Sequence, residues 1–170
     1  MPVRIATLED AEGVARVHVE SWQHAYREIL PAEYLASLSV EKRRAMWADA
    51  IAKDHPTVLV AEAESQVAGF SAVGRCRDEG AAVEDQEIWA IYVSPAHWTR
   101  GIGRELWHAS RELAIARRAR HISLWVIANN ERAIGFYESM GLERDAAMLK
   151  PFELGGAQLK EVRYAQALIA

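Results

Sequence analysis

The sequence predicts a mixed α/β fold in which helices cover both faces of a single sheet. The predicted order of elements is β-α-α-α-β-β-β-α-β-α-β-β, without internal repeats or linkers. A strand, a helix and a second strand follow one another between Glu87 and Ile127, which implies a right-handed crossover between two parallel strands. Predicted hairpins before and after this unit imply antiparallel neighbours, so the sheet is expected to be mixed.

The N-terminal third is predicted to form one short strand followed by three helical segments. Thr7 and Asp10 belong to a capping box where the first helix begins, and Ser39 can cap the third helix. Pro31 interrupts the helical spacing of apolar residues between the first two segments. The predicted ranges are a strand at 3–6 and helical segments at 11–29, 34–38 and 40–51.

The remainder of the chain alternates between β-rich and helical segments. Gly141 is predicted to terminate the last helix, and Pro151 with Gly155 and Gly156 joins the last two strands. The predicted strands are 57–62, 67–76, 87–93, 121–127, 143–149 and 158–165, and the predicted helices are 101–118 and 130–140.

The composition is that of an ordinary globular protein, and its 170 residues are expected to form one domain over 1–170. Hydrophobic residues make up 51% of the chain and charged residues 26%. The formal net charge of −4 argues against a nucleic-acid partner. No apolar run approaches the length of a membrane span, and the N-terminus does not resemble a signal peptide. We therefore expect a cytoplasmic protein without nucleic-acid or membrane partners.

The cysteine and histidine residues predict neither a disulfide nor a metal site. Cys76 is the single cysteine, so no internal disulfide can form, and a reducing compartment is permitted. Most lone cysteines are small packed hydrophobes, so Cys76 is not expected to be a nucleophile. The six histidines show neither His-x-x-x-His nor His-Glu-x-x-His spacing, so no metal is expected.

Two glycines, Gly101 and Gly103, lie between a predicted strand and a predicted helix. Such a junction leaves backbone N–H groups uncovered at the positive end of a helix dipole, and Arg100 and Arg104 add positive charge. The loop therefore predicts a phosphate-bearing ligand, although glycine also serves ordinary turns. A P-loop is excluded because its Gly-x-x-x-x-Gly-Lys-Ser/Thr string is absent, and a dinucleotide fingerprint because Leu106 stands at its third glycine.

A second motif follows the strand after the glycine helix. Residues 130–142 read Asn-Glu-Arg-Ala-Ile-Gly-Phe-Tyr-Glu-Ser-Met-Gly-Leu, which fits the pattern Asn-x-x-Ala-x-x-Phe-Tyr-x-x-x-Gly-Phe/Leu. The two motifs, in this order, resemble those of the GNAT superfamily of acetyl-CoA-dependent N-acetyltransferases, and the element order of the whole chain fits that fold. The resemblance implies a seven-stranded, mostly antiparallel sheet whose parallel β-α-β crossover carries the coenzyme A loop.

The chain departs from the family pattern at the start of this loop. The family loop reads Gln/Arg-x-x-Gly-x-Gly/Ala, whereas Trp98 stands at the Gln/Arg position and Thr99 where a glycine is common. This departure puts a side-chain contribution from position 98 in doubt. Binding of the pyrophosphate through backbone N–H groups is expected to survive it.

The resemblance implies that acetyl-CoA is the cosubstrate. Its pyrophosphate would lie on the backbone N–H groups of residues 100–104, and its pantetheine arm along the main chain of Ile91 and Val93. The Val93 N–H would polarise the thioester carbonyl, and Asn130 would hydrogen-bond to the pantetheine, although asparagine is also a good helix cap. The implied cofactor-binding residues are Ile91, Val93, Thr99, Arg100, Gly101, Ile102, Gly103, Arg104, Asn130, Ala133 and Phe136.

Two side chains are implied in catalysis. Tyr137 matches the family's tyrosine that protonates the departing thiolate, and Glu87 matches a glutamate that acts as general base, directly or through water. The alternatives are a core aromatic at 137 and an ordinary polar residue at the start of a strand at 87. Trp22, His24 and Tyr26 lie where the family frames its acceptor pocket, although Trp22 and Tyr26 also have the spacing of core residues.

The acceptor is the least determined part of the prediction. The acidic residues Glu79, Glu84 and Asp85 could attract a cationic amine, but acidic loops are usually only solvated. An amino acid, a polyamine, an antibiotic and a protein N-terminus all remain open as acceptors.

The leading hypothesis is therefore an enzyme that transfers an acetyl group to a primary amine of a small molecule or peptide. The alternatives are a non-catalytic regulatory module that binds coenzyme A or acyl-CoA, and a nucleotide-binding protein. The presence of both Tyr137 and Glu87 favours the enzyme. Apolar residues also predict a homodimer through the C-terminal strands. These residues are Leu149, Phe152, Leu154, Leu159, Val162 and Tyr164.

Overall fold

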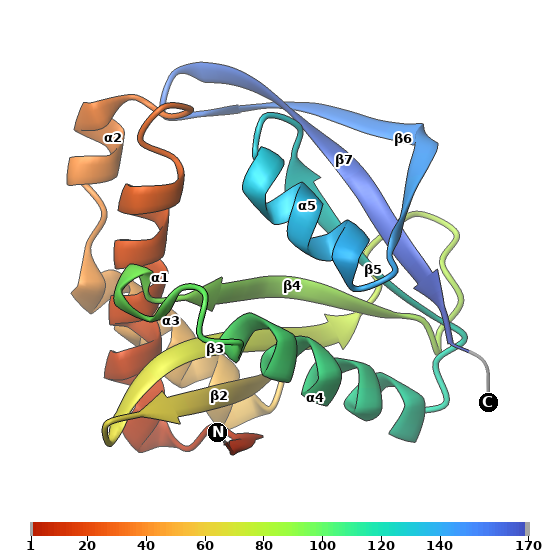
Figure 1. Cartoon of the computed structure of the whole chain (residues 1–170), viewed down its shortest axis with the longest axis horizontal. Helices are drawn as coiled ribbons and strands as arrows, with labels where there is room; N and C mark the ends of the chain where they lie inside the picture. Colours follow the sequence, from red (N-terminus) through yellow and green to blue (C-terminus); the bar gives the residue numbers. More distant parts are fainter. Residues whose placement is uncertain (1, 169–170) are drawn as a thin grey trace.

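The computed structural model describes residues 2–168, which form a seven-stranded sheet between layers of helices (Figure 1). The strands are β1 (Val3–Ile5), β2 (Thr57–Ala63), β3 (Gln66–Arg75), β4 (Gln86–Val93), β5 (His121–Ile127), β6 (Glu143–Leu154) and β7 (Ala157–Ala167). The helices are α1 (Ala11–Ala25), α2 (Ala32–Ala36), α3 (Val40–Lys53), α4 (Ile102–Ala116) and α5 (Glu131–Ser139), with 3₁₀ turns at Leu8–Asp10 and Pro95–His97.

The strand order in the sheet is β1-β2-β3-β4-β5-β7-β6. Within the described residues, β4 and β5 pair in parallel and each of the other neighbouring pairs is antiparallel. The predicted mixed fold, with a parallel crossover through α4 and mostly antiparallel neighbours, is confirmed.

The first helix is shorter than the apolar spacing predicts. Helix α1 ends at Ala25, and residues 26–30 form turns in which the N–H groups of Ile29 and Leu30 donate to the Tyr26 carbonyl. Pro31 follows, and a proline disfavours the helical backbone conformation of the residue before it. Tyr26 and Leu30 are nevertheless buried, so these turns bury the same apolar side chains that suggested a longer helix.

Helices α1 and α3 cover one face of the sheet (Figure 1). Val14 and Val17 of α1 are fully buried against Phe70 of β3. Inside this layer the indole N–H of Trp47 donates to His18 Nδ1 over 3.0 Å, so these two buried nitrogen atoms are paired with each other. The hydrogen bond fixes α3 relative to α1.

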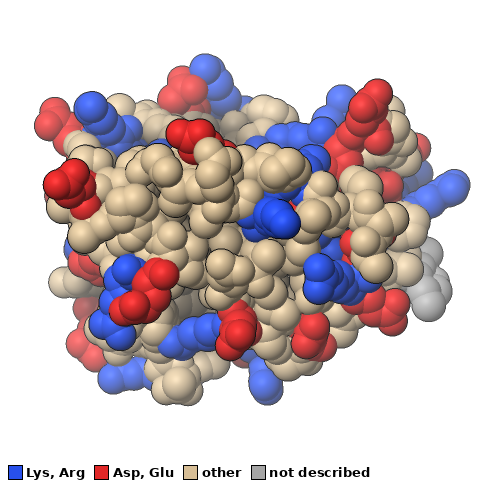
Figure 2. Space-filling view, turned by 90° about the horizontal axis from the view of Figure 1, so that it is seen from above, with Lys and Arg blue, Asp and Glu red and all other residues tan. Residues whose placement is uncertain are grey.

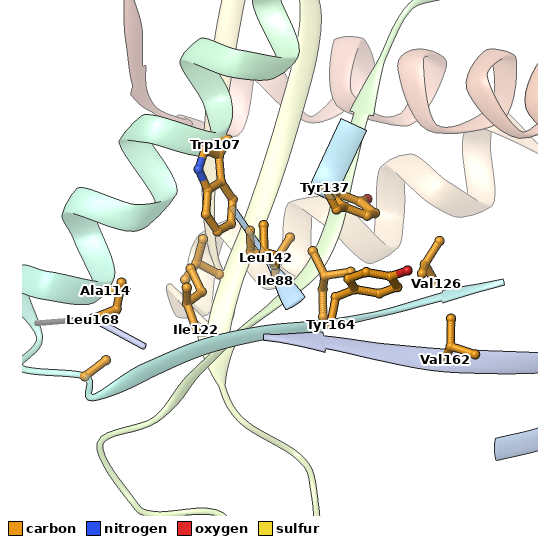
Figure 3. Close-up of a cluster of buried hydrophobic side chains, with 13 residues drawn as sticks. Ile88, Trp107, Ala114, Ile122, Val126, Tyr137, Leu142, Val162, Tyr164 and Leu168 are labelled. Carbon is orange, nitrogen blue, oxygen red and sulfur yellow. The ribbon is translucent and has the colours of Figure 1, made fainter. Parts of the chain in front are cut away.

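Helices α4 and α5 cover the other face (Figures 1 and 3). Trp107 of α4 and Tyr137 of α5 pack over Ile122 of β5 and Tyr164 of β7, as Figure 3 shows. The Tyr164 hydroxyl donates to Glu138 Oε1 at 2.9 Å, which ties α5 to the sheet. Buried aromatic rings contribute much of the apolar area in such a core, so this cluster holds both helices in place.

The two halves of the sheet separate beyond the start of the parallel pair. Strands β4 and β5 pair at Gln86↔Ile122 and Glu87↔Ser123, and no later pair joins them in the described residues. Strand β4 also contains a bulge at Trp89, because its register with β3 passes from Ile88 to Ala90 in one step. The sheet therefore opens between the C-terminal parts of β4 and β5.

The last hairpin is longer than predicted. Strand β6 continues through Pro151 to Leu154, where the sequence pattern predicts an end at residue 149. A proline is tolerated there because β6 is an edge strand, so its missing N–H removes no bond inside the sheet. The turn places Gly155 at φ +58°, and a Cβ on it would lie 2.5 Å from Cγ of Tyr34 in α2. The tip of the hairpin thus packs closely against α2 (Figure 1).

Candidate active site

A cavity of about 870 Å³ lies where the sheet opens. Its wall is formed by α1, the outer part of β4, the loop before α4, the end of β5, α5 and the tip of the β6–β7 hairpin. Cavities of roughly 300–1,000 Å³ are typical of sites for small molecules and cofactors. Most of the residues that the sequence implies lie in this wall: Ile91, Val93, Thr99, Gly101, Ile102, Gly103, Arg104, Asn130, Ala133, Phe136 and Tyr137.

Two of the predicted residues lie outside this wall. The Arg100 side chain is exposed and turns toward Glu64, with 3.8 Å between Nη1 and Oε1. Glu87 lies in a smaller cavity of about 170 Å³, which shares Ile88, Trp89, Trp125 and Glu161 with the larger one. Arg100 can therefore contact a ligand in the large cavity only through its backbone.

The glycine loop has the geometry of an anion site. Gly101 has φ +81° and precedes the first residue of α4, a backbone conformation that favours glycine. A Cβ at Gly101 would meet no atom within 4 Å, so the space above the loop is open. Gly103 lies against α5 instead, since a Cβ there would be in van der Waals contact with the Phe136 ring, at 3.4 Å. The N–H groups of the first turn of α4 thus face open space at a helix N-terminus.

Trp98, at the departure from the family pattern, anchors this loop. Its indole N–H donates to the Val93 carbonyl at 2.8 Å. The guanidinium of Arg132 stacks on its ring, with Cζ 3.3 Å from the ring centroid, and His24 packs edge-on against it. The tryptophan therefore holds a cation from α5 in the cavity wall, beside the loop where the pattern has a basic or amide side chain.

The main chain at the end of β4 is turned toward the opening. The Ser94 N–H donates to the Ala68 carbonyl, and ladder bonds between antiparallel strands occur at every second pair. Ile91 and Val93 consequently direct their backbone groups away from β3, into the gap beside β5. The Val93 carbonyl accepts from Trp98 and from the Ser21 hydroxyl at 3.1 Å, so the Val93 N–H is the group left for a ligand.

Tyr137 lies in the cavity wall and also belongs to the apolar cluster beneath α5, with 8% of its surface exposed. Burial raises the pKa of its hydroxyl, so the group stays protonated at neutral pH. Asn130 caps α5, because its side-chain oxygen accepts from the Ala133 N–H at 3.2 Å. The capping role considered for Asn130 is therefore present.

Glu87 is buried and held by Arg77. Its Oε2 accepts from the Arg77 backbone N–H at 2.9 Å, and its Oε1 accepts from the guanidinium at 2.5 Å. The side chain of Glu87 is 2% exposed. This carboxylate therefore anchors the start of the loop at 76–85 and reaches the large cavity only by way of the smaller one.

Several residues in the wall are not singled out by the sequence patterns. Arg132 stands in the second motif as an unspecified position, and Glu161 stands in a predicted strand that is distinguished by its apolar residues. For Glu161, the two-residue period of a strand is a signal that could have been used. Val162 and Tyr164 face the α5 layer, so Glu161 must point to the other face of the sheet. Tyr92 is a further residue of this kind. Of the three residues expected at the acceptor pocket, Trp22 and Tyr26 line the cavity and His24 does not.

Neither a metal centre nor a membrane-spanning helix accompanies this cavity in the described part of the chain. Within residues 2–168, no group of three or more His, Cys, Asp or Glu side chains is arranged to hold a metal ion. None of the helices in that range is both long enough and apolar enough to cross a membrane.

Comparison with known proteins identifies the family. A model of the Acetyltransferase (GNAT) family matches residues 19–142. The chain belongs to this family. The uncharacterized N-acetyltransferase YuaI of Bacillus subtilis (strain 168) is 37% identical over 161 residues, which are 94% of this chain and 89% of the relative. This GNAT protein is therefore an acetyltransferase, as its two motifs predict.

Solved structures agree on the fold. The ribosomal-protein-alanine N-acetyltransferase of Brucella melitensis has a TM-score of 0.79 at 23% identity, covering 99% of this chain and 100% of that one. The PaiA N-acetyltransferase of Thermoplasma acidophilum, solved in complex with coenzyme A, has a TM-score of 0.75 at 21% identity, again covering 99% and 100%. At these identities the likeness shows the GNAT fold of this chain, which the sequence predicts.

Proposed function

We propose that this GNAT acetyltransferase transfers an acetyl group from acetyl-CoA to a primary amine by direct attack within the large cavity. The observation that carries the proposal is a single wall shared by the α4 loop, the free edge of β4 and Tyr137. Direct transfer requires both substrates in one space, and one cavity bordered by all three features provides it.

The cosubstrate is assigned to the loop and the free edge of β4. The N–H groups of residues 101–104 would hold its pyrophosphate, with Arg104 and Arg132 supplying positive charge nearby. The exposed backbone of Ile91 and Val93 would pair with its amide-rich arm, as peptide ligands pair with a strand edge. The Val93 N–H would donate to the thioester carbonyl oxygen, where negative charge develops during attack.

The proposed reaction exchanges one bond for another and releases one proton. The amine nitrogen forms a bond to the acetyl carbon, and the bond between that carbon and sulfur breaks. On the way from ammonium to amide the nitrogen loses two protons. Tyr137 donates a proton to the sulfur and regains one, so one proton is released overall. The raised pKa of Tyr137 keeps its hydroxyl in the donor form.

We propose that Glu87 removes a proton from the ammonium through water in the smaller cavity, because Arg77 holds its carboxylate outside the wall of the large one. Activity should then rise with pH to a plateau, and Glu87→Gln should shift that limb upward or flatten it. The matched control is Glu84→Gln, an exposed residue of the same acidic segment. An unchanged pH profile in Glu87→Gln would assign the proton transfer to another group.

We further propose that the 170-residue chain acts in the cytoplasm as one catalytic domain and forms a homodimer through β6. Of the apolar residues behind the dimer prediction, Leu149 is 49% exposed, while Phe152 and Leu154 line the cavity. Leu159, Val162 and Tyr164 are buried within the chain, so an interface would rely on the outer edge of the sheet. A 19.0 kDa species in sedimentation at micromolar concentration would contradict the dimer.

The test of the proposed reaction is release of the coenzyme A thiol with a panel of primary amines, together with mass spectrometry of the products. We expect thiol release that depends on the amine and yields one acetylated amine for each thiol. Release at the same rate without amine would indicate hydrolysis instead. Absence of release with every class of amine would contradict the proposed function.

A further inference from the structure

We propose that the acceptor is a primary amine with one positive charge on an apolar, preferably aromatic body, and that Glu161 binds its ammonium group. This inference rests on the proposed function and names the substrate class for the same cavity. It comes from three features of the structure: an unpaired carboxylate, an aromatic wall, and the distribution of charge around the cavity.

The carboxylate of Glu161 is left without a partner by its neighbours. Lys150 lies directly opposite it on β6, but its Nζ turns to Asp78, at 3.4 Å, and lies 3.9 Å from the centroid of the Trp125 ring. Arg163, two residues along β7, donates to Asp78 at 2.7 Å. No cation of residues 2–168 lies within 4.0 Å of the Glu161 carboxylate, whereas Asp78 has two.

The remaining nearby cation is also engaged elsewhere. Arg77 is bound to Glu87, whose carboxylate takes both its backbone N–H and its guanidinium. Glu161 is half-buried and borders both cavities, so it has lost part of its hydration without gaining an ion pair. Burial raises the pKa of Glu161, and this effect outweighs the opposing influence of Lys150 and Arg77. A bound ammonium would supply the missing partner.

The wall next to Glu161 is aromatic and apolar. The rings of Trp22 in α1 and Tyr26 in the turn after it meet edge to face with centroids 5.1 Å apart, and the ring centroid of Tyr92 in β4 lies 6.4 Å from that of Trp22. Phe152 and Leu154 of the hairpin complete this side of the cavity. Such a surface favours the apolar body of a ligand.

The two arginines of the cavity wall lie at one of its ends. Arg104 and Arg132 come from the N-terminal turns of α4 and α5, where the proposed function places the cosubstrate phosphates, and Glu105 of α4 lines the wall beside them. At the hairpin end, the charged residue in the wall is Glu161. Arg43 approaches Trp22, with its Cζ 5.9 Å from the ring, but it lies outside the cavity wall.

This arrangement selects against two other classes of amine. The carboxylate of an α-amino acid would lie beside its ammonium group and would be repelled by Glu161, while Lys150 and Arg77, the cations nearest to Glu161, are engaged with Asp78 and Glu87. A second ammonium group, as in a diamine, would have to lie against the aromatic wall without water or a counterion. On the outer face over β6, β7 and α2, side chains of both signs are scattered around a broad uncharged area (Figure 2). Selection of a cation is therefore left to the cavity.

The first test compares acceptors in the thiol-release assay. The probes are 2-phenylethylamine, phenylalanine, phenylalanine methyl ester and butane-1,4-diamine. We expect kcat/KM for 2-phenylethylamine and the ester to exceed that for phenylalanine and the diamine by roughly tenfold or more. The ester is the matched control for phenylalanine, because it keeps the ring and the amine and removes only the negative charge. Equal or better use of phenylalanine or of the diamine would overturn the proposal.

The second test uses Glu161→Gln, which keeps the shape of the side chain and removes its charge. We expect the KM for 2-phenylethylamine to rise about 10- to 100-fold, since a hydrogen bond to a charged group contributes about that factor, while the KM for acetyl-CoA stays unchanged. Glu161→Asp, which keeps the charge, should retain more affinity for the amine than Glu161→Gln. The control is Glu153→Gln, an exposed residue of the same hairpin.

Calorimetric binding of acetyl-CoA by each variant shows that it is folded. An amine KM that is unchanged in Glu161→Gln would overturn the role of Glu161. These results distinguish failure of this inference from failure of the proposed function. If only the inference is wrong, the unaltered protein will acetylate amines of another class. If the proposed function is wrong, it will acetylate no amine of any class.

Discussion

At the scale of single residues, Gly101 combines two requirements of the site. Its φ of +81° favours glycine, and the space above it is open to a ligand. Gly101→Glu would put bulk and negative charge into that space. We expect this variant to fold and to lose binding of acetyl-CoA in calorimetry, because the carboxylate would lie where the phosphates bind.

Gly80 provides the control for this substitution. It also has a positive φ, +76°, and a Cβ there would meet no atom within 4 Å, but it lies in the loop at 76–85. Gly80→Glu therefore introduces the same backbone strain and the same charge away from the cavity, and we expect normal binding. Unchanged affinity in a folded Gly101→Glu variant would refute the assignment of the loop.

Tyr137 is the residue whose chemical role can be separated from its packing. Tyr137→Phe keeps the ring in the cluster below α5 and removes only the hydroxyl. If the hydroxyl donates a proton to the departing sulfur, kcat should fall by ~10²–10⁴-fold with little change in the affinity for acetyl-CoA. Tyr34→Phe in α2, outside the cavity wall, should leave kcat unchanged. Near-normal turnover of Tyr137→Phe would contradict the role as proton donor and would mean that Tyr137 is only an aromatic residue of the core.

At the scale of elements, the β6–β7 hairpin depends on its turn. Gly155 and Gly156 have φ of +58° and +85°, so alanine is strained at both, but a Cβ would strike Tyr34 only at Gly155. Gly155→Ala should therefore destabilise the protein more than Gly156→Ala, by about 1–3 kcal/mol, as overpacking does. Chemical denaturation of the two variants measures the difference. Equal stabilities would show that the hairpin tip does not rest on α2.

The sequence predicts the elements well where local patterns determine them. The glycine loop, the Asn130 cap and the strand at residues 121–127 all lie where propensity and spacing place them. The extension of β6 through Pro151 could not be predicted in this way, because it depends on the strand lying at the edge of the sheet.

The same distinction applies to the candidate site. The residues of the two motifs are local, and most of them lie in one cavity. The pairing of Glu87 with Arg77 and the isolation of Glu161 depend on which of several charges from β4, β6, β7 and the loop at 76–85 meet in space. Composition and period carry no information about that choice, so the acceptor end of the cavity required the structure.

At the scale of the whole molecule, stability should depend on pH through His18. Burial, reinforced by Arg43, lowers the pKa of His18 to about 3, against about 6.5 in an unfolded chain. Between these values the unfolded chain binds a proton that the folded protein does not. The free energy of unfolding should therefore fall as the pH is lowered below about 6.5, by up to ~1.4 kcal/mol for each pH unit, and be unaffected above it.

Thermal unfolding between pH 6.5 and 4.5 measures this slope above the range in which most carboxylates titrate. His18→Gln keeps an acceptor for the Trp47 N–H but cannot titrate, so its stability should vary less with pH. His108→Gln, at an exposed position of α4, should keep the slope of the unaltered protein. A slope that persists in His18→Gln would mean that other groups cause it.

The pairing of β5 has a consequence for the order in which the protein is made. Strand β5 is joined to β4 at two residues but to β7 along its whole length, and β7 is synthesised only after β5, α5 and β6. A nascent or truncated chain that ends before Ala157 would expose the edge of β5 to pairing with other chains. It would also lack Glu161. Interrupted synthesis is thus expected to yield aggregation-prone fragments that lack the residue proposed to bind the amine.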